Sequence, residues 1–254
     1  MQTSPGLNIT VWGEGEPAVF VHGSFGWGEE TWAKQRPLAA SHRLLLVDRR
    51  GFGGSPADGR VDFDRDANDI AVLLGDGAHL VGHSYGGVVA LLAAGLRPEA
   101  VRSLTVIEPP AFGVARGNVV VEAFISGVDD AMREASDPSD YRQRFLRNFG
   151  FDATPQKLEG PAYKAARSSW QERSPAEAEI PFAALRGVRT LVVRGDWTAA
   201  PAAARARARV IFHAVCDVLE EELDAESATF PSAHNPQLLG KPFNERLLSF
   251  WGAE

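Results

Sequence analysis

A lone serine stands between glycines at residues 82–87 (Gly-His-Ser-Tyr-Gly-Gly), directly after an apolar run. A serine hydroxyl is a weak nucleophile at neutral pH, so it must be exposed, within reach of a base and beside N–H donors that can stabilise an oxyanion. A sharp turn from a strand into a helix meets these needs, and glycines two residues to either side leave room for the strained backbone. The pattern predicts that Ser84 is a nucleophile; the alternative is a serine that only caps the following helix.

A serine nucleophile needs a base, and His234 is the best placed of the six histidines. It follows the last strand-like run, in a loop from which its ring can lie over the end of a sheet. His83 is expected to point from the turn into internal packing, and His22 to brace the turn that follows it. The remaining histidines have no chemical partners nearby in the sequence: His42, His79 and His213.

Two carboxylates are candidates for the acid that orients His234. Glu108 and Asp196 each follow a strand-like run. Two prolines come directly after Glu108 and would hold its carboxylate at a fixed strand tip. From the residues alone, either carboxylate can reach a histidine above the sheet.

Backbone N–H groups are the expected oxyanion donors. One comes from Tyr85, which follows the candidate nucleophile, and the other from Ser24 or Phe25 in the glycine-rich loop at residues 22–26. In the absence of the serine motif, this loop would be interpreted as a plain connection from a strand to a helix.

Short apolar runs bounded by turn residues alternate with helical patterns along the chain. This alternation predicts β-α-β units and a mostly parallel sheet. The first run is followed by a glycine-rich turn and predicts a hairpin arm at one edge. The runs lie at residues 8–11, 18–21, 44–47, 79–81, 104–107, 190–193 and 227–230.

The alternation breaks between residues 109 and 182, which are rich in charge and in helical patterns. We expect one domain over residues 1–254, with a core formed by 1–108 and 183–254 and a helical insertion at 109–182. Ligands of open α/β sheets bind beyond the carboxyl ends of the strands. An insertion that leaves one of these ends would therefore cover the site as a cap.

The chain has 254 residues, a net charge of −7 and a single cysteine, Cys216. The negative charge argues against a nucleic-acid or anionic-membrane partner and favours a small molecule. A lone cysteine allows no intrachain disulfide and indicates a reducing compartment. Residues 1–6 lack the layout of a signal peptide and no apolar run reaches spanning length, so we expect a cytoplasmic protein. No metal-ligand spacing and no phosphate-binding glycine motif emerges, so we expect no metal and no cofactor.

Together these motifs resemble the α/β-hydrolase superfamily, over about residues 7–251. The resemblance implies an α/β-hydrolase fold: a mostly parallel central sheet flanked by helices, with a helical cap inserted after strand six. It also implies Ser84 as nucleophile and His234 as base. The oxyanion hole would be formed by the main-chain N–H groups of Ser24 and Tyr85. The matching segments occur in the family's order, at residues 22–26, 48–55, 82–87 and 233–234.

The chain departs from the family's usual pattern at the acid. Most members carry an aspartate at the position that is Thr198 here, and Asp196 falls at a less critical place. A subset of the superfamily places the acid at the tip of strand six, and Glu108 fits that arrangement. We therefore favour Glu108 over Asp196 as the group that orients the base.

A serine at this position, where related dehalogenases and epoxide hydrolases have an aspartate, implies acyl transfer to water. We expect a cofactor-independent serine hydrolase, monomeric or homodimeric, that cleaves an ester or lactone of a small hydrophobic molecule through an acyl-enzyme on Ser84. Alternatives on the same fold are thioester or carbon–carbon bond hydrolysis, perhydrolysis, and a ligand receptor without turnover. The substrate pocket would be lined by aromatic and apolar residues: Phe25, Trp27, Pro110 and Trp170.

Overall fold

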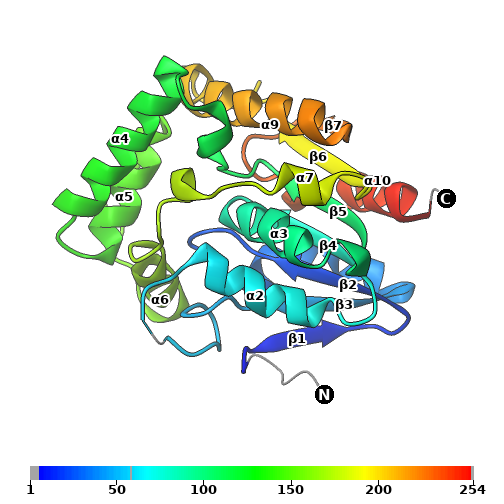
Figure 1. Cartoon of the computed structure of the whole chain (residues 1–254). Coiled ribbons are helices and arrows are strands. Elements are labelled where there is room, and N and C mark those ends of the chain that lie inside the picture. Colours follow the sequence, from blue (N-terminus) through cyan, green and yellow to red (C-terminus); the bar gives the residue numbers. More distant parts are fainter. Residues whose placement is uncertain (1–5, 58, 253–254) are drawn as a thin grey trace.

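A seven-stranded sheet organises the part of the chain that the computed structural model describes, residues 6–57 and 59–252. Its strands are β1 (Ile9–Trp12), β2 (Glu16–Val21), β3 (His42–Val47), β4 (Ala78–His83), β5 (Val101–Ile107), β6 (Thr190–Gly195) and β7 (Glu226–Phe230). Their order is β1-β3-β2-β4-β5-β6-β7 (Figure 1). All strands from β2 to β7 are parallel, which confirms the predicted fold class. Residues 1–5, in which we expect no signal peptide, lie outside the described residues.

The first strand lies at an edge of the sheet, as predicted, but it forms no hairpin with the second. β1 runs antiparallel to β3, with Ile9 opposite Val47. β2 is paired on one side with β3 and on the other with β4, so neither of its edges is open to β1. The hairpin prediction is therefore wrong: a short arm pairs where an edge is available, and here that is the outer edge of β3.

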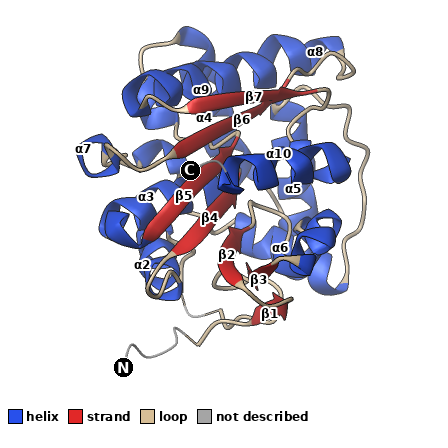
Figure 2. Cartoon of the chain, turned by 90° about the vertical axis from the view of Figure 1, so that its right-hand side faces the viewer, coloured by secondary structure: helices blue, strands red, loops and turns tan. Residues whose placement is uncertain are grey.

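Helices cover both faces of the sheet, with α2 and α3 on one side and α10 on the other (Figure 2). The longer helices are α2 (Phe63–Leu73), α3 (Tyr85–Leu96), α4 (Val119–Glu134), α5 (Pro138–Asn148), α6 (Gly160–Ser169), α9 (Val210–Leu223) and α10 (Lys241–Gly252). Shorter turns are α1 (Gly28–Thr31), η1 (Ala33–Ala40), η2 (Pro98–Ala100), η3 (Phe112–Ala115), η4 (Pro175–Glu177), α7 (Phe182–Leu185), α8 (Ala202–Ala204), η5 (Arg205–Arg209) and η6 (Pro236–Leu239). None of the helices in the described ranges has both the length and the apolarity that crossing a bilayer requires.

Alternate residues of the central strands face two hydrophobic clusters. In β2, Val19 and Val21 pack in the cluster that includes residues of α2, α3 and α9. Ala18 and Phe20 point the other way, into the cluster that includes Trp32 and residues of α10. This period of two with apolar side chains on both faces is what a parallel strand requires when helices cover both sides.

Residues 109–182 leave the sheet after β5 and return to it at β6, and they carry α4, α5 and α6 (Figure 1). This inserted segment lies beyond the carboxyl ends of the strands, because residues of α4 and α5 line a cavity together with Ser84, which follows β4. The resemblance placed the insertion after strand six. Among the described strands it follows the fifth, β5, since only β1 to β4 come before that strand.

The packing around Phe20 provides a test of the second cluster. Its ring is fully buried and meets Trp32 edge-on at a centroid distance of 5.0 Å and Trp251 at 6.2 Å. Phe20→Ala is expected to lower the free energy of unfolding by about 3–5 kcal/mol, because it leaves a cavity between two large rings. Chemical denaturation measures the change.

The matched control is Val11→Ala in β1, whose side chain is 54% exposed and whose loss should change the stability by less than about 0.5 kcal/mol. Similar effects of the two substitutions would contradict this assignment of the core.

Candidate active site

Ser84 occupies a sharp turn between β4 and α3. Its backbone has φ 52° and ψ −128°, a conformation that L-residues rarely adopt and that costs about 1–3 kcal/mol. The turn is held by two main-chain hydrogen bonds, from Ser84 N–H to the carbonyl of Ile107 (2.9 Å) and from Gly87 N–H to the carbonyl of Ser84 (2.7 Å). Ser84 is the N-cap residue of α3, but its hydroxyl makes no capping hydrogen bond. The simple capping alternative therefore does not describe this serine.

The glycines around Ser84 are required by close backbone contacts. A Cβ on Gly82 would lie 2.3 Å from the carbonyl oxygen of Gly86, and a Cβ on Gly86 would lie 2.3 Å from that of Val21. A Cβ on Gly23, in the loop after β2, would lie 2.7 Å from the Cβ of Ser84. The serine turn and the loop after β2 thus pack directly against each other.

Glu108 lies at the end of β5 and contacts His234 from the loop after β7. The distance from Glu108 Oε2 to His234 Nδ1 is 2.7 Å, and the glutamate is completely buried. Its other oxygen, Oε1, accepts hydrogen bonds from the backbone N–H of Gly195 and from Nε1–H of Trp197, both at 2.8 Å. The carboxylate therefore holds His234 Nδ1, which leaves Nε2 as the ring nitrogen that can accept a proton.

Ser84 and His234 line the same cavity. The Ser84 hydroxyl makes no hydrogen bond to another residue of the described ranges, so it is free to turn toward the imidazole. Contacts of this kind are often longer in an empty site than in the complex with substrate. The arrangement can therefore pair a hydroxyl with a base that a buried carboxylate orients.

Asp196, the alternative acid, lies in a different environment. Its Oδ1 accepts hydrogen bonds from the backbone N–H of Thr198 at 2.9 Å and from the Thr198 hydroxyl at 3.0 Å. The aspartate thus closes the turn after β6. Of the two candidate carboxylates, the structure brings Glu108 to His234 and leaves Asp196 in the turn.

Two further histidines support the contact between Glu108 and His234. Burial, with a smaller effect from His234, lowers the pKa of His83 to about 3, so its ring is neutral and donates from Nε2 to the carbonyl of His234 at 2.9 Å. His213 Nε2 lies 2.9 Å from the carbonyl of Gly195, the residue whose N–H binds Glu108. Sequence reasoning missed both roles, since each histidine acts on a backbone group from a distant segment.

The two expected oxyanion donors are the N–H groups of Tyr85, which directly follows Ser84, and of Ser24, which lines the same cavity as Ser84. Tyr85 begins α3, so its N–H has no acceptor within the helix. Within the described ranges, Ser24 N–H makes no backbone hydrogen bond, whereas Phe25 N–H donates to Ser169 Oγ at 2.8 Å. Of the two residues considered for the second donor, Ser24 is the one whose N–H is available.

A buried ionic cluster fixes the loop that contains Ser24. Glu172, shortly after α6, accepts a hydrogen bond from the Ser24 hydroxyl at Oε2 (2.5 Å) and from Arg49 Nη2 at Oε1 (2.6 Å). Arg49 also pairs with Asp66 at 3.1 Å and donates to the carbonyls of His22 and Gly23. Burial raises the pKa of Glu172, and Arg49 opposes this shift by stabilising the charged form.

Glu172 was not identified from the sequence. It lies in the inserted segment far from the serine motif along the chain, and no local pattern distinguishes it from a solvated glutamate. His22, by contrast, braces its turn as expected: it accepts from Arg49 N–H at 3.0 Å, and its other ring nitrogen lies 2.7 Å from the carbonyl of Gly23.

Residues 18–242 match the sequence pattern of the alpha/beta hydrolase family. The chain belongs to this family. A pimeloyl-(acyl-carrier protein) methyl ester esterase of Aeromonas hydrophila is 37% identical over 110 residues, which covers 42% of this chain and 43% of that protein. The chain spans only 32% to 43% of the length of the first curated relatives it matches.

Solved structures of two enzymes resemble this α/β hydrolase over nearly its whole length. An esterase from Exiguobacterium antarcticum superposes with a TM-score of 0.67 at 20% identity, covering 97% of this chain and 96% of that one. An N-acyl homoserine lactone degrading enzyme superposes with a TM-score of 0.62 at 22% identity, covering 96% of each chain. At these identities the likeness shows a shared fold.

Two cavities of this α/β hydrolase meet at Ser84 and Ser24. The larger has a volume of about 530 Å³ and reaches from His234 to α5, with Phe25 and Phe149 in its wall. The smaller is a narrow apolar slot of about 40 Å³ beneath α4. It is lined by Pro110 and by residues such as Phe112, Phe124, Ile125, Val128 and Met132.

Trp27 and Trp170, which we expected in the pocket, line neither of these two cavities. Trp27 packs against a separate small cluster with Phe52 and Val61. Trp170 donates from Nε1 to the carbonyl of Met132 and therefore supports the inserted segment from outside the slot. Aromatic composition alone did not distinguish a pocket wall from local packing.

The contact between Gly86 and β2 in this α/β hydrolase gives a test of the serine turn. Gly86→Ala is expected to lower the free energy of unfolding by about 1–3 kcal/mol or more, because the new Cβ would meet two main-chain oxygens, of Val21 at 2.3 Å and of His22 at 2.5 Å. Thermal unfolding measures the effect.

Gly252→Ala in α10 is the control, since a Cβ there meets nothing within 4 Å. Equal stability of the two variants would show that the turn does not need glycine at residue 86.

Proposed function

We propose that this α/β hydrolase is a serine hydrolase that cleaves an ester-type bond, a carboxylic ester or a lactone, of a small hydrophobic molecule. The observation that carries the proposal is the 2.7 Å contact of buried Glu108 with His234, which lines the same cavity as the strained Ser84. A buried carboxylate, an imidazole and an uncapped serine are the groups needed for acyl transfer. The site uses no cofactor in this proposal.

The reaction follows from these positions. Ser84 Oγ attacks the substrate carbonyl carbon while His234 Nε2 takes the hydroxyl proton, and Glu108 stabilises the imidazolium that forms. The tetrahedral intermediate collapses, the carbon–oxygen bond to the alcohol breaks, and His234 returns the proton to that oxygen. Water then attacks the acyl-enzyme carbonyl carbon while His234 takes its proton. The bond from this carbon to Ser84 Oγ breaks, His234 returns the proton to Oγ, and the acid is released.

The oxyanion of both intermediates would be stabilised by the N–H groups of Tyr85 and Ser24. Both belong to segments that are fixed against Ser84, Tyr85 by the start of α3 and Ser24 by the contact of its loop with the serine turn. Rigid donors are what this role requires, since donors that must reorganise during the reaction stabilise the charge less.

The two cavities favour a substrate with one small and one larger part. The 40 Å³ slot has room for a short apolar group on one side of Ser84, and the 530 Å³ cavity for a bulkier part on the other. The names of the related methyl ester esterase and lactone-degrading enzyme are consistent with this chemistry. In the same proposal, residues 109–182 are a cap over one domain formed by 1–108 and 183–254, and the enzyme is cytoplasmic, as a monomer or homodimer.

Substitution of each candidate group tests the mechanism on chromogenic esters of graded acyl length. Ser84→Ala should lower kcat/KM by about 10⁴-fold or more, and Glu108→Gln by about 10²–10⁴-fold, because the neutral amide no longer stabilises the imidazolium. Asp196→Asn should stay within about threefold of the wild type, because Asp196 only closes a turn. Wild type, but not Ser84→Ala, should react with a fluorophosphonate probe.

Full activity of Ser84→Ala would overturn the mechanism. Collapse of Asp196→Asn with full activity of Glu108→Gln would overturn the assignment of the acid. Tight binding of esters by a wild type that neither turns them over nor reacts with the probe would favour the receptor alternative.

Glu172 provides a separate test of the Ser24 donor. Glu172→Gln and Ser24→Ala should each lower kcat by about 10-fold with little change in KM, because each loosens the loop that holds the oxyanion donor. This effect is smaller than the about 10²–10³-fold that an oxyanion donor itself contributes, since the donor is displaced and not removed. The double variant should be no worse than either single one, since both break the same contact. Steady-state kinetics give these numbers.

Asp66→Asn is the matched control, because it removes the other carboxylate of Arg49 without touching Ser24. If Asp66→Asn lowers kcat as much as Glu172→Gln, the cluster acts through general stability and not through Ser24.

A further inference from the structure

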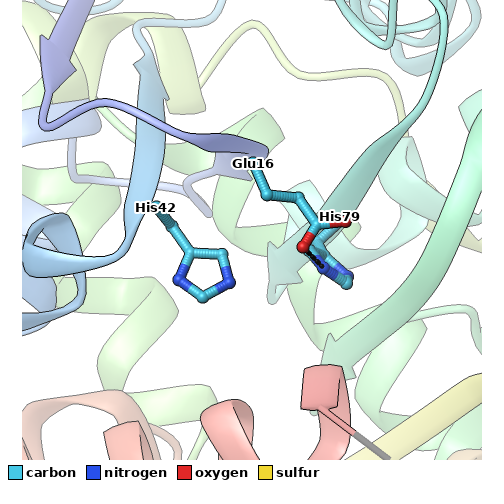
Figure 3. A group of neighbouring side chains, drawn as sticks. All are labelled: Glu16, His42 and His79. Atoms are coloured by element: carbon cyan, nitrogen blue, oxygen red, sulfur yellow. Dashed lines mark ion pairs between the residues drawn. The ribbon is translucent and has the colours of Figure 1, made fainter. Parts of the chain in front are cut away.

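Three side chains converge near the amino ends of three neighbouring strands (Figure 3). Glu16 begins β2, His42 begins β3, and His79 lies near the start of β4. Glu16 and His42 are direct partners across the ladder, and His79 is opposite Ala18, so three neighbouring parallel strands each present one of these groups. Because parallel strands start at the same edge, this cluster is at the far end of the strands from the serine turn.

The cluster brings together atoms that all carry lone pairs. One ligand atom from each residue lies within 4.8 Å of the other two, and Glu16 Oε2 is 3.6 Å from His79 Nε2. That distance is too long for a hydrogen bond. His79 is only 4% exposed and its Nε2 has no hydrogen-bond partner, so a buried nitrogen points at a carboxylate and a second imidazole without being satisfied. Such an atom is costly unless a further group binds it.

Both imidazoles are oriented in the way that metal-binding histidines are. His79 Nδ1 lies 2.7 Å from Ser103 Oγ, and His42 Nδ1 lies 2.8 Å from Ser41 Oγ. When a hydroxyl accepts a hydrogen bond from Nδ1–H, the free lone pair of the neutral ring is on Nε2, which is then the ligand atom. The ring of Trp251 stacks on His79 at a centroid distance of 4.7 Å and holds its plane.

The charges around the cluster leave one carboxylate oxygen for a ligand. Arg102 pairs with Glu16 Oε1, on the side away from the oxygen that faces His79.

We propose that Glu16, His42 and His79 form a binding site for one divalent cation of the zinc type. Two imidazole nitrogens and one carboxylate oxygen are ligands that Zn²⁺ prefers, and a water molecule on the half-exposed side of Glu16 and His42 would complete a tetrahedron. Ligand atoms of a tetrahedral zinc site are about 3.3–3.4 Å apart when the bonds are about 2.0–2.1 Å. The 3.6 Å between Glu16 and His79 is close to this value, and His42, whose ligand atom lies within 4.8 Å of the other two, would complete the set by a small shift of its half-buried ring.

Such an ion would stabilise the fold and take no part in the hydrolysis. It would link the first residues of β2, β3 and β4. The ion would bind three ligands that are close together only in the folded chain, so its binding favours the folded state. Cation binding at this site therefore does not depend on the mechanism proposed for Ser84.

Binding of Zn²⁺ and Co²⁺ to the full chain tests the proposal. We expect one equivalent of Zn²⁺ by calorimetry, a ligand-field spectrum typical of four-coordinate Co²⁺, and a rise in Tm of about 5–10 °C at a free Zn²⁺ concentration about 100 times the Kd. Glu16→Gln and His42→Gln should each weaken binding by at least about 10-fold. These two residues are used because they are half-exposed, whereas replacement of buried His79 could unfold the sheet.

The controls separate this site from other ligands in the chain. Glu14→Gln removes the same charge from an exposed position nearby and should leave the affinity unchanged. His234→Gln removes the imidazole of the candidate active site and should also leave it unchanged. Arg102→Gln should tighten binding, because it removes a cation that competes for Glu16. The proposal is overturned if Zn²⁺ shows no saturable binding, or if binding is lost in His234→Gln and retained in Glu16→Gln and His42→Gln.

Discussion

The hydrogen bonding of the buried Glu108 carboxylate is the interaction on which the geometry of the candidate active site depends. A buried charge must be paired and hydrogen-bonded, since an uncompensated one costs several kcal/mol. Glu108 meets this requirement with three partners: Gly195 at the end of β6, Trp197 in the next turn, and His234 after β7. One side chain directly after β5 therefore links the segments that follow two other strands, and the ring of His234 takes its position from that constraint.

The second constraint couples the inserted segment to the core. Arg49 is fully buried and needs anions, and it finds one in Asp66 of α2 and one in Glu172 of the inserted segment. Because Glu172 also binds the Ser24 hydroxyl, a shift of the inserted segment would be transmitted to the loop beside Ser84. The hydrolase thus has a direct connection between the segment whose helices line the cavities and a candidate oxyanion donor.

The parts of the fold and site that could be predicted from the sequence are those encoded locally. Alternating apolar runs predicted the parallel sheet, and the glycines around Ser84 predicted a turn whose need for glycine is visible in its close main-chain contacts. The roles of Glu172, His83 and His213 could not be predicted, because each depends on which distant backbone or side-chain group the fold brings alongside. The pairing of β1 failed for a related reason: it depends on which strand edge remains open after β2 has been paired on both sides.

Backbone strain distinguishes the two ends of the sheet. Among the described residues, five other than glycine have positive φ, and one of these, Asp224, ends helix α9. The other four follow β2, β4, β5 and β6 directly or within a few residues: Phe25, Ser84, Glu108 and Trp197. Strain of this kind persists only where the surrounding contacts over-determine the conformation, and such contacts gather at sites of chemistry. The amino ends of the same strands carry instead an unstrained backbone and an unsatisfied buried imidazole, His79, whose cost a bound cation would remove. The strained end thus carries the candidate active site, and the unstrained end the proposed cation site.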